Sequence, residues 1–172
     1  LEDTRRVMEG GGAELEKKLF ARDDYIDNLK SVIDNKCFKL LGNERLPKRI
    51  VDKIRAINVA TSNMERIGDF AVNIVAQLQY LDDFDVMLHF GPGPFFEKIL
   101  EAMTLVDTAL LDANMKLALQ LCRSEVDVDE LYAAVFARIM DQLRAGYPPE
   151  DLITSLFIYR YFERIGDSLL NV

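Results

Sequence analysis

The pentapeptide Glu-Arg-Ile-Gly-Asp occurs twice in this chain and constrains its fold more than any other feature. It covers residues 65–69 and returns unchanged at residues 163–167, 98 positions later. Each copy is followed by an asparagine, Asn73 or Asn171, four residues after the aspartate. A repeat at this distance indicates that the chain contains two copies of one structural unit.

Hydrophobic residues recur at spacings of three and four, which is the helical period. Two such series run through equivalent parts of the repeats: Leu15, Leu19, Ile26, Leu29, Ile33 and Leu40, and then Leu117, Leu121, Val128, Leu131, Val135 and Ile139. No strand-like alternation competes with this pattern, and Gly- and Pro-containing segments separate the helical stretches. We predict an all-α fold with helices at roughly 12–41, 47–81, 94–111, 114–145 and 149–172.

The segment HFGPGP, residues 89–94, divides the two repeats. We predict a first helical bundle over residues 1–88 and a second over residues 94–172. The second bundle begins with a full helix, whereas the first has only Leu1 to Glu9 in the equivalent place. We therefore expect the first bundle to lack most of its first helix, the last helix to end early, and both ends to be cut from a longer chain.

Each repeat carries an acidic pair on the helix that precedes the pentapeptide. Residues four apart lie on the same face of a helix, so each pair points in one direction. If the two long helices of a repeat are antiparallel neighbours, four carboxylates converge in each half. The four pairs are Asp23 with Asp27, Glu65 with Asp69, Glu125 with Asp129, and Glu163 with Asp167.

A cluster of four carboxylates must be neutralised by a cation, by basic side chains or by protonation. Carboxylate oxygens suit Mg²⁺, Ca²⁺, Mn²⁺ or iron, and zinc accepts them too. None of the four motifs contains the histidine of di-iron carboxylate bundles, which weakens an oxidase interpretation. Asp24 and Asn28 compete with Asp23 and Asp27 as the ligand pair of the first helix.

Plainer interpretations of the same residues stay open. A single acidic pair is most often a solvated helix face. Arg66 and Arg164 could form surface ion pairs, or could contact the ligand side chains without binding the metal themselves. Asn73 and Asn171 could likewise be polar packing residues, or could contact the ligand side chains without binding the metal themselves. Glycine costs about 1 kcal/mol inside a helix, so Gly68 and Gly166 predict close helix packing.

Composition excludes several other classes of function. The net charge of −8 leaves no basic footprint for nucleic acid, and it favours cations or basic protein surfaces as partners. His89 is the single histidine, and the chain has no phosphate-binding loop, so we predict no enzyme. Cys37 and Cys122 lie in apolar helical sequence, which predicts core thiols in a reducing compartment.

The placed motifs resemble the PhoU family, the phosphate-uptake regulators of bacteria and archaea. The resemblance rests on NMERIGDFAVNI and YFERIGDSLLNV, each preceded by an acidic motif, DDYID or EVDVD. It implies two tandem three-helix bundles with spectrin-like up-down-up topology, and metal clusters of iron or zinc on their outer surface. Carried over, the first site is Asp23, Asp27, Glu65 and Asp69, and the second is Glu125, Asp129, Glu163 and Asp167.

The resemblance also implies a cytoplasmic, non-enzymatic protein at the inner face of the cell membrane. Such a protein damps phosphate uptake and phosphate-starvation signalling through the ATPase of the phosphate transporter and a sensor histidine kinase. One alternative is a PhoU-like cytoplasmic domain of a sodium/phosphate cotransporter or other ion transporter, whose partner is the fused membrane domain. Another is a metal-free helical interaction module. A homodimer is compatible with each of these.

Overall fold

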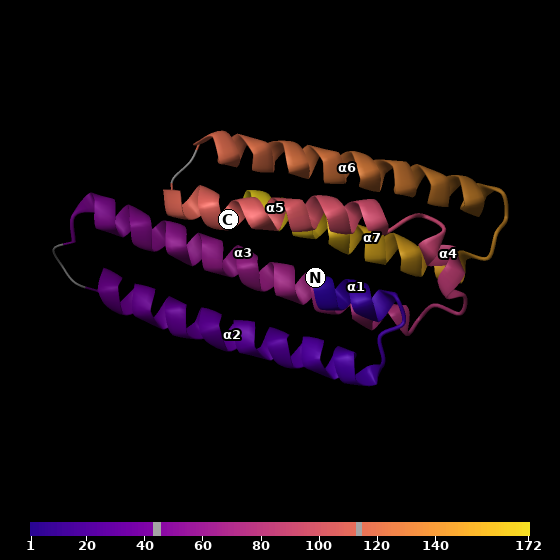
Figure 1. Ribbon diagram of the computed structural model, residues 1–172, viewed down its shortest axis with the longest axis horizontal. Coiled ribbons are helices and arrows are strands. Elements are labelled where there is room, and N and C mark those ends of the chain that lie inside the picture. Colours follow the sequence, from indigo (N-terminus) through magenta and orange to yellow (C-terminus); the bar gives the residue numbers. More distant parts are fainter. Residues whose placement is uncertain (43–45, 113–114) are drawn as a thin grey trace.

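The computed structural model describes residues 1–42, 46–112 and 115–172, and all regular secondary structure in these ranges is helical. The predicted all-α fold is thereby confirmed. Seven helices lie in the described ranges (Figure 1): α1 (Glu2–Met8), α2 (Ala13–Leu41), α3 (Lys48–Leu78), α4 (Phe84–Leu88), α5 (Gly93–Asp112), α6 (Met115–Arg144) and α7 (Pro149–Leu170).

The long helices begin and end within a few residues of the predicted positions, and two short helices were not predicted. Helix α1 and helix α4 have 7 and 5 residues, too few to display an apolar period. Helix α4 begins after Asp83, whose side chain accepts a hydrogen bond from the backbone nitrogen of Asp85 at 2.9 Å. Helix α3, which was predicted over residues 47–81, ends at Leu78. The turn that follows it leads to the cap of α4 at Asp83.

Helices α3 and α7 pack against each other in antiparallel directions at the centre of the molecule, with α2 and α6 on opposite outer sides (Figure 1). The Asn63 side-chain amide near the middle of α3 donates to the backbone oxygen of Asn171, at the end of α7. The rings of Phe70 and Tyr161 stack at a centroid distance of 5.9 Å. The two pentapeptides consequently lie side by side in one helix pair.

One hydrophobic core extends through both repeats. Phe95, Phe96, Tyr159 and Phe162 form its aromatic part and are almost completely buried. Full burial of such a side chain contributes about 1.5–3 kcal/mol to folding. The Tyr159 hydroxyl donates to the backbone oxygen of Met87 at 3.0 Å, and burial raises the pKa of that phenol. Ile67 and Ile74 of the first repeat belong to the same core.

The first repeat leaves part of its helix seam uncovered, because α1 has 7 residues where α5 has 20. Asp3 connects α1 to α2 through an ion pair with Arg22, and it also pairs with Arg6 within α1. Beyond α1, an apolar cavity of about 500 Å³ lies over the seam of α2 and α3. Its lining includes Ile26, Ile33, Met64, Val72, Met103 and Val106. No helix in the described parts of the chain has the length and apolar character needed to cross a membrane.

The glycine of each pentapeptide lies where an outer helix comes closest, which confirms the predicted close packing. A Cβ atom on Gly166 would lie 3.2 Å from Cγ1 of Val128 in α6. A Cβ atom on Gly68 would lie 2.8 Å from Oδ1 of Asp23 in α2. Any larger residue would push these helices or side chains apart.

Replacing the two glycines by alanine should have different effects. In Gly166→Ala the new methyl group meets a β-branched side chain that has little freedom to rotate. Overpacking of about 1–3 kcal/mol then exceeds the gain of about 1 kcal/mol in helix propensity. In Gly68→Ala the neighbour is a carboxylate that can turn away. Urea denaturation should give a lower free energy of unfolding for Gly166→Ala than for Gly68→Ala, and the reverse order would contradict this packing.

Candidate functional site

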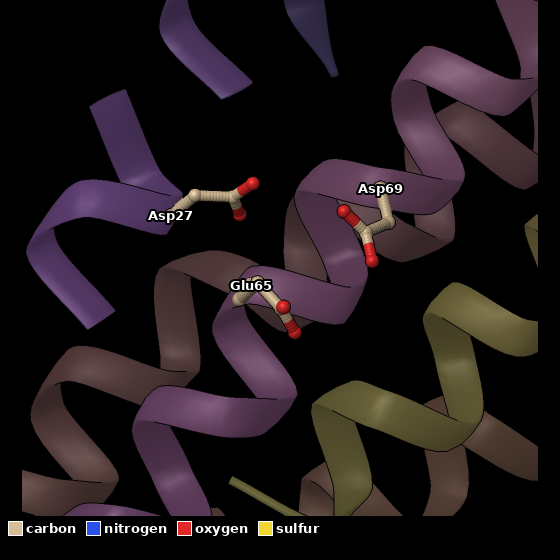
Figure 2. A group of neighbouring side chains, drawn as sticks. All are labelled: Asp27, Glu65 and Asp69. Atoms are coloured by element: carbon tan, nitrogen blue, oxygen red, sulfur yellow. The ribbon is translucent and has the colours of Figure 1, made fainter. Parts of the chain in front are cut away.

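The first acidic site lies between α2 and α3. Asp27 extends from α2 toward α3, from which Glu65 and Asp69 project (Figure 2). One carboxylate oxygen of each residue lies within 4.8 Å of the others. Glu65 and Asp69 are half-buried and Asp27 is exposed, so the group lies at the edge of the helix seam and is accessible from solvent.

Asp23 is the fourth predicted member of this site and does not join the other three. Its carboxyl group lies against Gly68, and its Oδ1 atom is buried without a hydrogen-bond partner. Burial is the main reason that the pKa of Asp23 is raised to about 6, and the charges of Asp69 and Asp27 raise it further. Asp23 is therefore a partly desolvated acid beside the group of three carboxylates.

Burial and mutual repulsion also act on the carboxylates of α3. Burial raises the pKa of Glu65, with a further contribution from Asp69, and burial followed by the charge of Asp27 raises the pKa of Asp69. Lys30 opposes these shifts from α2, where its Nζ atom lies 3.9 Å from Oε1 of Glu65. The site thus holds more negative charge than its own basic neighbours neutralise.

The second acidic site lies between α6 and α7 and has the same general form. Oxygen atoms of Glu125, Asp129 and Asp167 lie within 4.8 Å of one another. Burial raises the pKa of Glu125, and the charges of Asp129 and Asp167 add to the effect. Here Glu125 and Asp129 come from the outer helix α6, and Asp167 comes from the central helix α7, so the acids meet across the seam.

Glu163 is the fourth predicted member of the second site, and arginines hold it apart. The residue is only 8% exposed, and its Oε1 atom pairs with Nη1 of Arg160 at 2.5 Å. The Nε atom of Arg164 lies 3.7 Å from its other oxygen, Oε2, which is buried without a hydrogen bond. Burial raises the pKa of Glu163 and the charge of Asp167 adds to this, whereas the two arginines lower it.

Each site therefore gathers three of its four predicted acids, and the acid left out differs. Asp23 is left out in the first site, although its counterpart Glu125 takes part in the second. Glu125 has one more methylene group and reaches the other carboxylates. Glu163 is left out in the second site, although its counterpart Glu65 takes part in the first, because Arg160 captures it.

Two basic partners of the sites, Lys30 and Arg160, were missed in the sequence, whereas Arg164 pairs with acids, which was one of its expected roles. The first site has Lys30 on α2, and the equivalent position of α6 is Tyr132. The second site has Arg160 on α7, stacked on the Tyr132 ring with 5.4 Å between its guanidinium carbon and the ring centroid. The equivalent position of α3 is Ser62. Aligning the repeats at every position, and not only at the acids, would have revealed this exchange of a lysine for an arginine–tyrosine pair.

The remaining predicted residues surround the sites without joining them. Asn171 ends α7, where its side-chain amide donates to the backbone oxygen of Asp167 at 2.7 Å. Asn73 is half-buried on α3. The Arg66 guanidinium stacks on Phe70 at 5.7 Å, whereas Arg164 pairs with Asp167 at 3.2 Å.

The structure also places the alternative ligand pair of the first helix, Asp24 and Asn28, and the two cysteines. Asp24 and Asn28 are exposed, and the amide of Asn28 donates to the backbone oxygen of Asp24, so this pair faces away from the three carboxylates. Cys37 is buried as predicted. The prediction of a core thiol is wrong for Cys122, which lies on the solvent face of α6 and is exposed.

The two groups of carboxylates have the chemistry to hold a cation. Their oxygens are hard ligands, and each group has an unpartnered buried oxygen beside it, from Asp23 or Glu163. A bound cation would neutralise the charge that burial and repulsion make unfavourable. The residues therefore fit a divalent or trivalent metal on the chemistry of their ligand atoms.

Comparison with known proteins gives consistent results. The family model of the PhoU domain matches residues 1–78 and again residues 95–172. The Phosphate-specific transport system accessory protein PhoU homolog of Clostridium acetobutylicum is 24% identical over 99% of this chain and 79% of its own length. Escherichia coli PhoU, with the corresponding name, is 22% identical over all of this chain and 72% of its own length. The crystal structure of PhoU from Pseudomonas aeruginosa superimposes with a TM-score of 0.82 at 19% identity, covering 99% of this chain and 83% of that one.

Asp23 should make stability depend on pH. Its pKa is about 6 in the folded protein against an ordinary value of 3.8, so the folded state binds this proton more tightly. The free energy of unfolding should therefore fall as the pH rises from 3.8 to about 6. Asp23→Asn should make this decrease smaller and leave the part due to the other carboxyl groups with raised pKa values. It should stabilise the metal-free protein at neutral pH by on the order of 1 kcal/mol, since solvent screens part of the repulsion.

Chemical denaturation at several pH values, with a chelator present, measures the effect. The matched control is Asp52→Asn, whose side chain is exposed and is not among the charges that act on Asp23, so it should leave the pH dependence unchanged. A pH profile of Asp23→Asn that follows the wild type would show that Asp23 is not the group responsible.

Proposed function

Because this chain belongs to the PhoU domain family, we propose that it regulates phosphate uptake as a non-enzymatic accessory protein of a phosphate transport system. The family match includes both repeats, and the relatives compared above carry that role in their names. The finer proposal is that the chain damps phosphate uptake and starvation signalling by contacting the ATPase of the transporter and a sensor histidine kinase.

The observation that carries the proposal is the pair of three-carboxylate groups, one in each repeat. Asp27, Glu65 and Asp69 would hold metal in the first repeat. Glu125, Asp129 and Asp167 would hold it in the second. Iron or zinc is our first expectation, and magnesium, manganese or calcium would also suit carboxylate oxygens.

A metal in these positions would connect an outer helix to a central helix. In the first site one ligand comes from α2 and two from α3, whereas in the second two come from α6 and one from α7. Neutralising the carboxylates would remove their repulsion across the seam and hold the helices together. The outer faces of α2 and α6 would then present a defined shape to protein partners.

A metal-free interaction module is the second candidate, and one observation favours it. Lys30, Arg160 and Arg164 already pair with acids of the sites, so part of the charge is balanced within the chain. In that case the acids would recognise basic partner surfaces, and their binding would weaken as salt is added.

Metal analysis distinguishes the two candidates. Wild-type protein purified without chelator should retain metal, Asp69→Asn should lose the metal of the first site, and Asp167→Asn should lose that of the second. An excess of the metal should raise the melting temperature, since a ligand at 100 times its dissociation constant stabilises by about 2.7 kcal/mol. The same excess should have no such effect on the double variant.

Asp52→Asn combined with Asp141→Asn is the matched control, because both acids are exposed and lie outside the two sites. The control should bind as much metal as the wild type. Equal metal content in the wild type and the Asp69→Asn/Asp167→Asn variant would exclude the metal proposal and leave the metal-free module.

The regulatory role is tested in cells that lack their own PhoU-domain protein. Expression of this chain should lower the uptake of labelled phosphate when phosphate is plentiful. The Asp69→Asn/Asp167→Asn variant should restore high uptake if metal is required, and the Asp52→Asn/Asp141→Asn control should not. Equal phosphate uptake with and without expression of the chain would contradict the regulatory proposal itself.

A further inference from the structure

The end of the α2–α3 hairpin has a composition unlike that of the rest of the chain. We define the hairpin end by the described residues 36–42 and 46–55. It contains six basic side chains against one acid, Asp52, in a protein whose net charge is −8. The basic residues are Lys36, Lys39, Lys48, Arg49, Lys53 and Arg55.

The basic side chains of the hairpin end are available to a partner. All six are exposed, and none of them forms an ion pair with a described residue. Several basic residues elsewhere, such as Arg22, Lys98 and Arg160, each pair with an acid. The hairpin end therefore presents concentrated positive charge that the folded chain itself does not neutralise.

Apolar side chains accompany this charge. Phe38 is 81% exposed and is the most exposed of the large hydrophobic residues that the structure describes. Leu40, Leu41 and Ile50 are exposed close to it in the sequence or on the facing helix. Exposed aromatic and aliphatic groups beside unpaired lysines are typical of surfaces that enter the interface of a lipid bilayer.

The hairpin end also projects from the molecule. Figure 1 shows α2 and α3 extending, at the left, past the ends of α5, α6 and α7. The six basic residues come from both helices of the hairpin, two from α2 and four from α3. A projecting end of this kind can reach a flat, charged surface without obstruction by α5, α6 and α7 (Figure 1).

We propose that the hairpin end docks this protein on anionic lipid bilayers. The lysines and arginines are attracted to acidic headgroups, and Phe38 with its aliphatic neighbours inserts at the boundary of headgroups and acyl chains. The strongly acidic remainder of the chain is repelled from the same surface, which orients the molecule with the hairpin end toward the membrane. This inference does not depend on metal binding or on the regulatory role.

The second repeat supplies a matched control within the same molecule. Residues 138–153, at the end of the α6–α7 hairpin, contain two arginines against three acids. Arg144 pairs with Asp141, and Arg138 donates to the backbone oxygen of His89. Tyr147 is 60% exposed there, so this end has an exposed aromatic ring without a surplus of positive charge.

Fluorescence can report insertion directly, because the chain contains no tryptophan. Phe38→Trp should show a blue-shifted emission with vesicles of phosphatidylglycerol and phosphatidylcholine, and no shift with phosphatidylcholine alone. Added salt should reverse the shift, since it screens the attraction. Tyr147→Trp should show no shift with either vesicle. Equal shifts for both variants, or no shift for Phe38→Trp, would overturn the proposal.

Cosedimentation with the same vesicles tests the charge. Lys39→Gln/Lys48→Gln/Lys53→Gln should weaken binding to anionic vesicles by roughly a hundredfold, taking a factor of about five for each basic residue removed. The control Lys17→Gln/Lys18→Gln/Arg123→Gln removes the same charge from exposed positions elsewhere and should retain binding. Circular dichroism confirms that both variants are folded.

Three results would overturn the proposal. The first is wild-type protein that does not sediment with anionic vesicles. The second is an equal loss of binding in both triple variants, which would assign the effect to general charge. The third is binding of the hairpin end to an acidic protein without binding to anionic vesicles.

Discussion

The antiparallel packing of α3 against α7 is the contact on which the rest of the structure depends. Ile67 and Ile165, the central residues of the two pentapeptides, are both buried in the shared core. With the isoleucines directed inward, the glycines meet the outer helices, and the acids of each pentapeptide follow the edge of the same seam. One helix pair thus positions both acidic sites, and for this reason the pentapeptide occurs twice.

Placing acids at a helix seam creates an electrostatic difficulty that the two repeats resolve differently. Burial and like charges raise the pKa values of Asp23, Glu65 and Asp69 in the first repeat, where Lys30 offers partial compensation. In the second repeat two arginines hold Glu163 directly. The repeats therefore share a backbone arrangement and differ in how much charge a bound cation would have to neutralise.

Much of the fold was predictable because helical periodicity and acidic spacing are local properties of a sequence. The long helices α2, α3, α5, α6 and α7 each contain enough turns for an apolar stripe to repeat, and their limits were predicted closely. Helices α1 and α4 are too short for such a stripe. The exposure of Cys122 was also missed. Apolar neighbours in a helical sequence do not specify whether a cysteine faces the core or the solvent.

The sequence by itself determined that the chain is helical and duplicated, and that four acidic pairs lie on its helix faces, because all three follow from residue spacing along one helix. Only the tertiary structure decided which acids meet. Asp23 lies against Gly68 because its side chain is short, and Arg160 stacks on Tyr132 and draws Glu163 aside. These outcomes depend on side-chain reach and on contacts between different helices, which spacing along one helix does not specify.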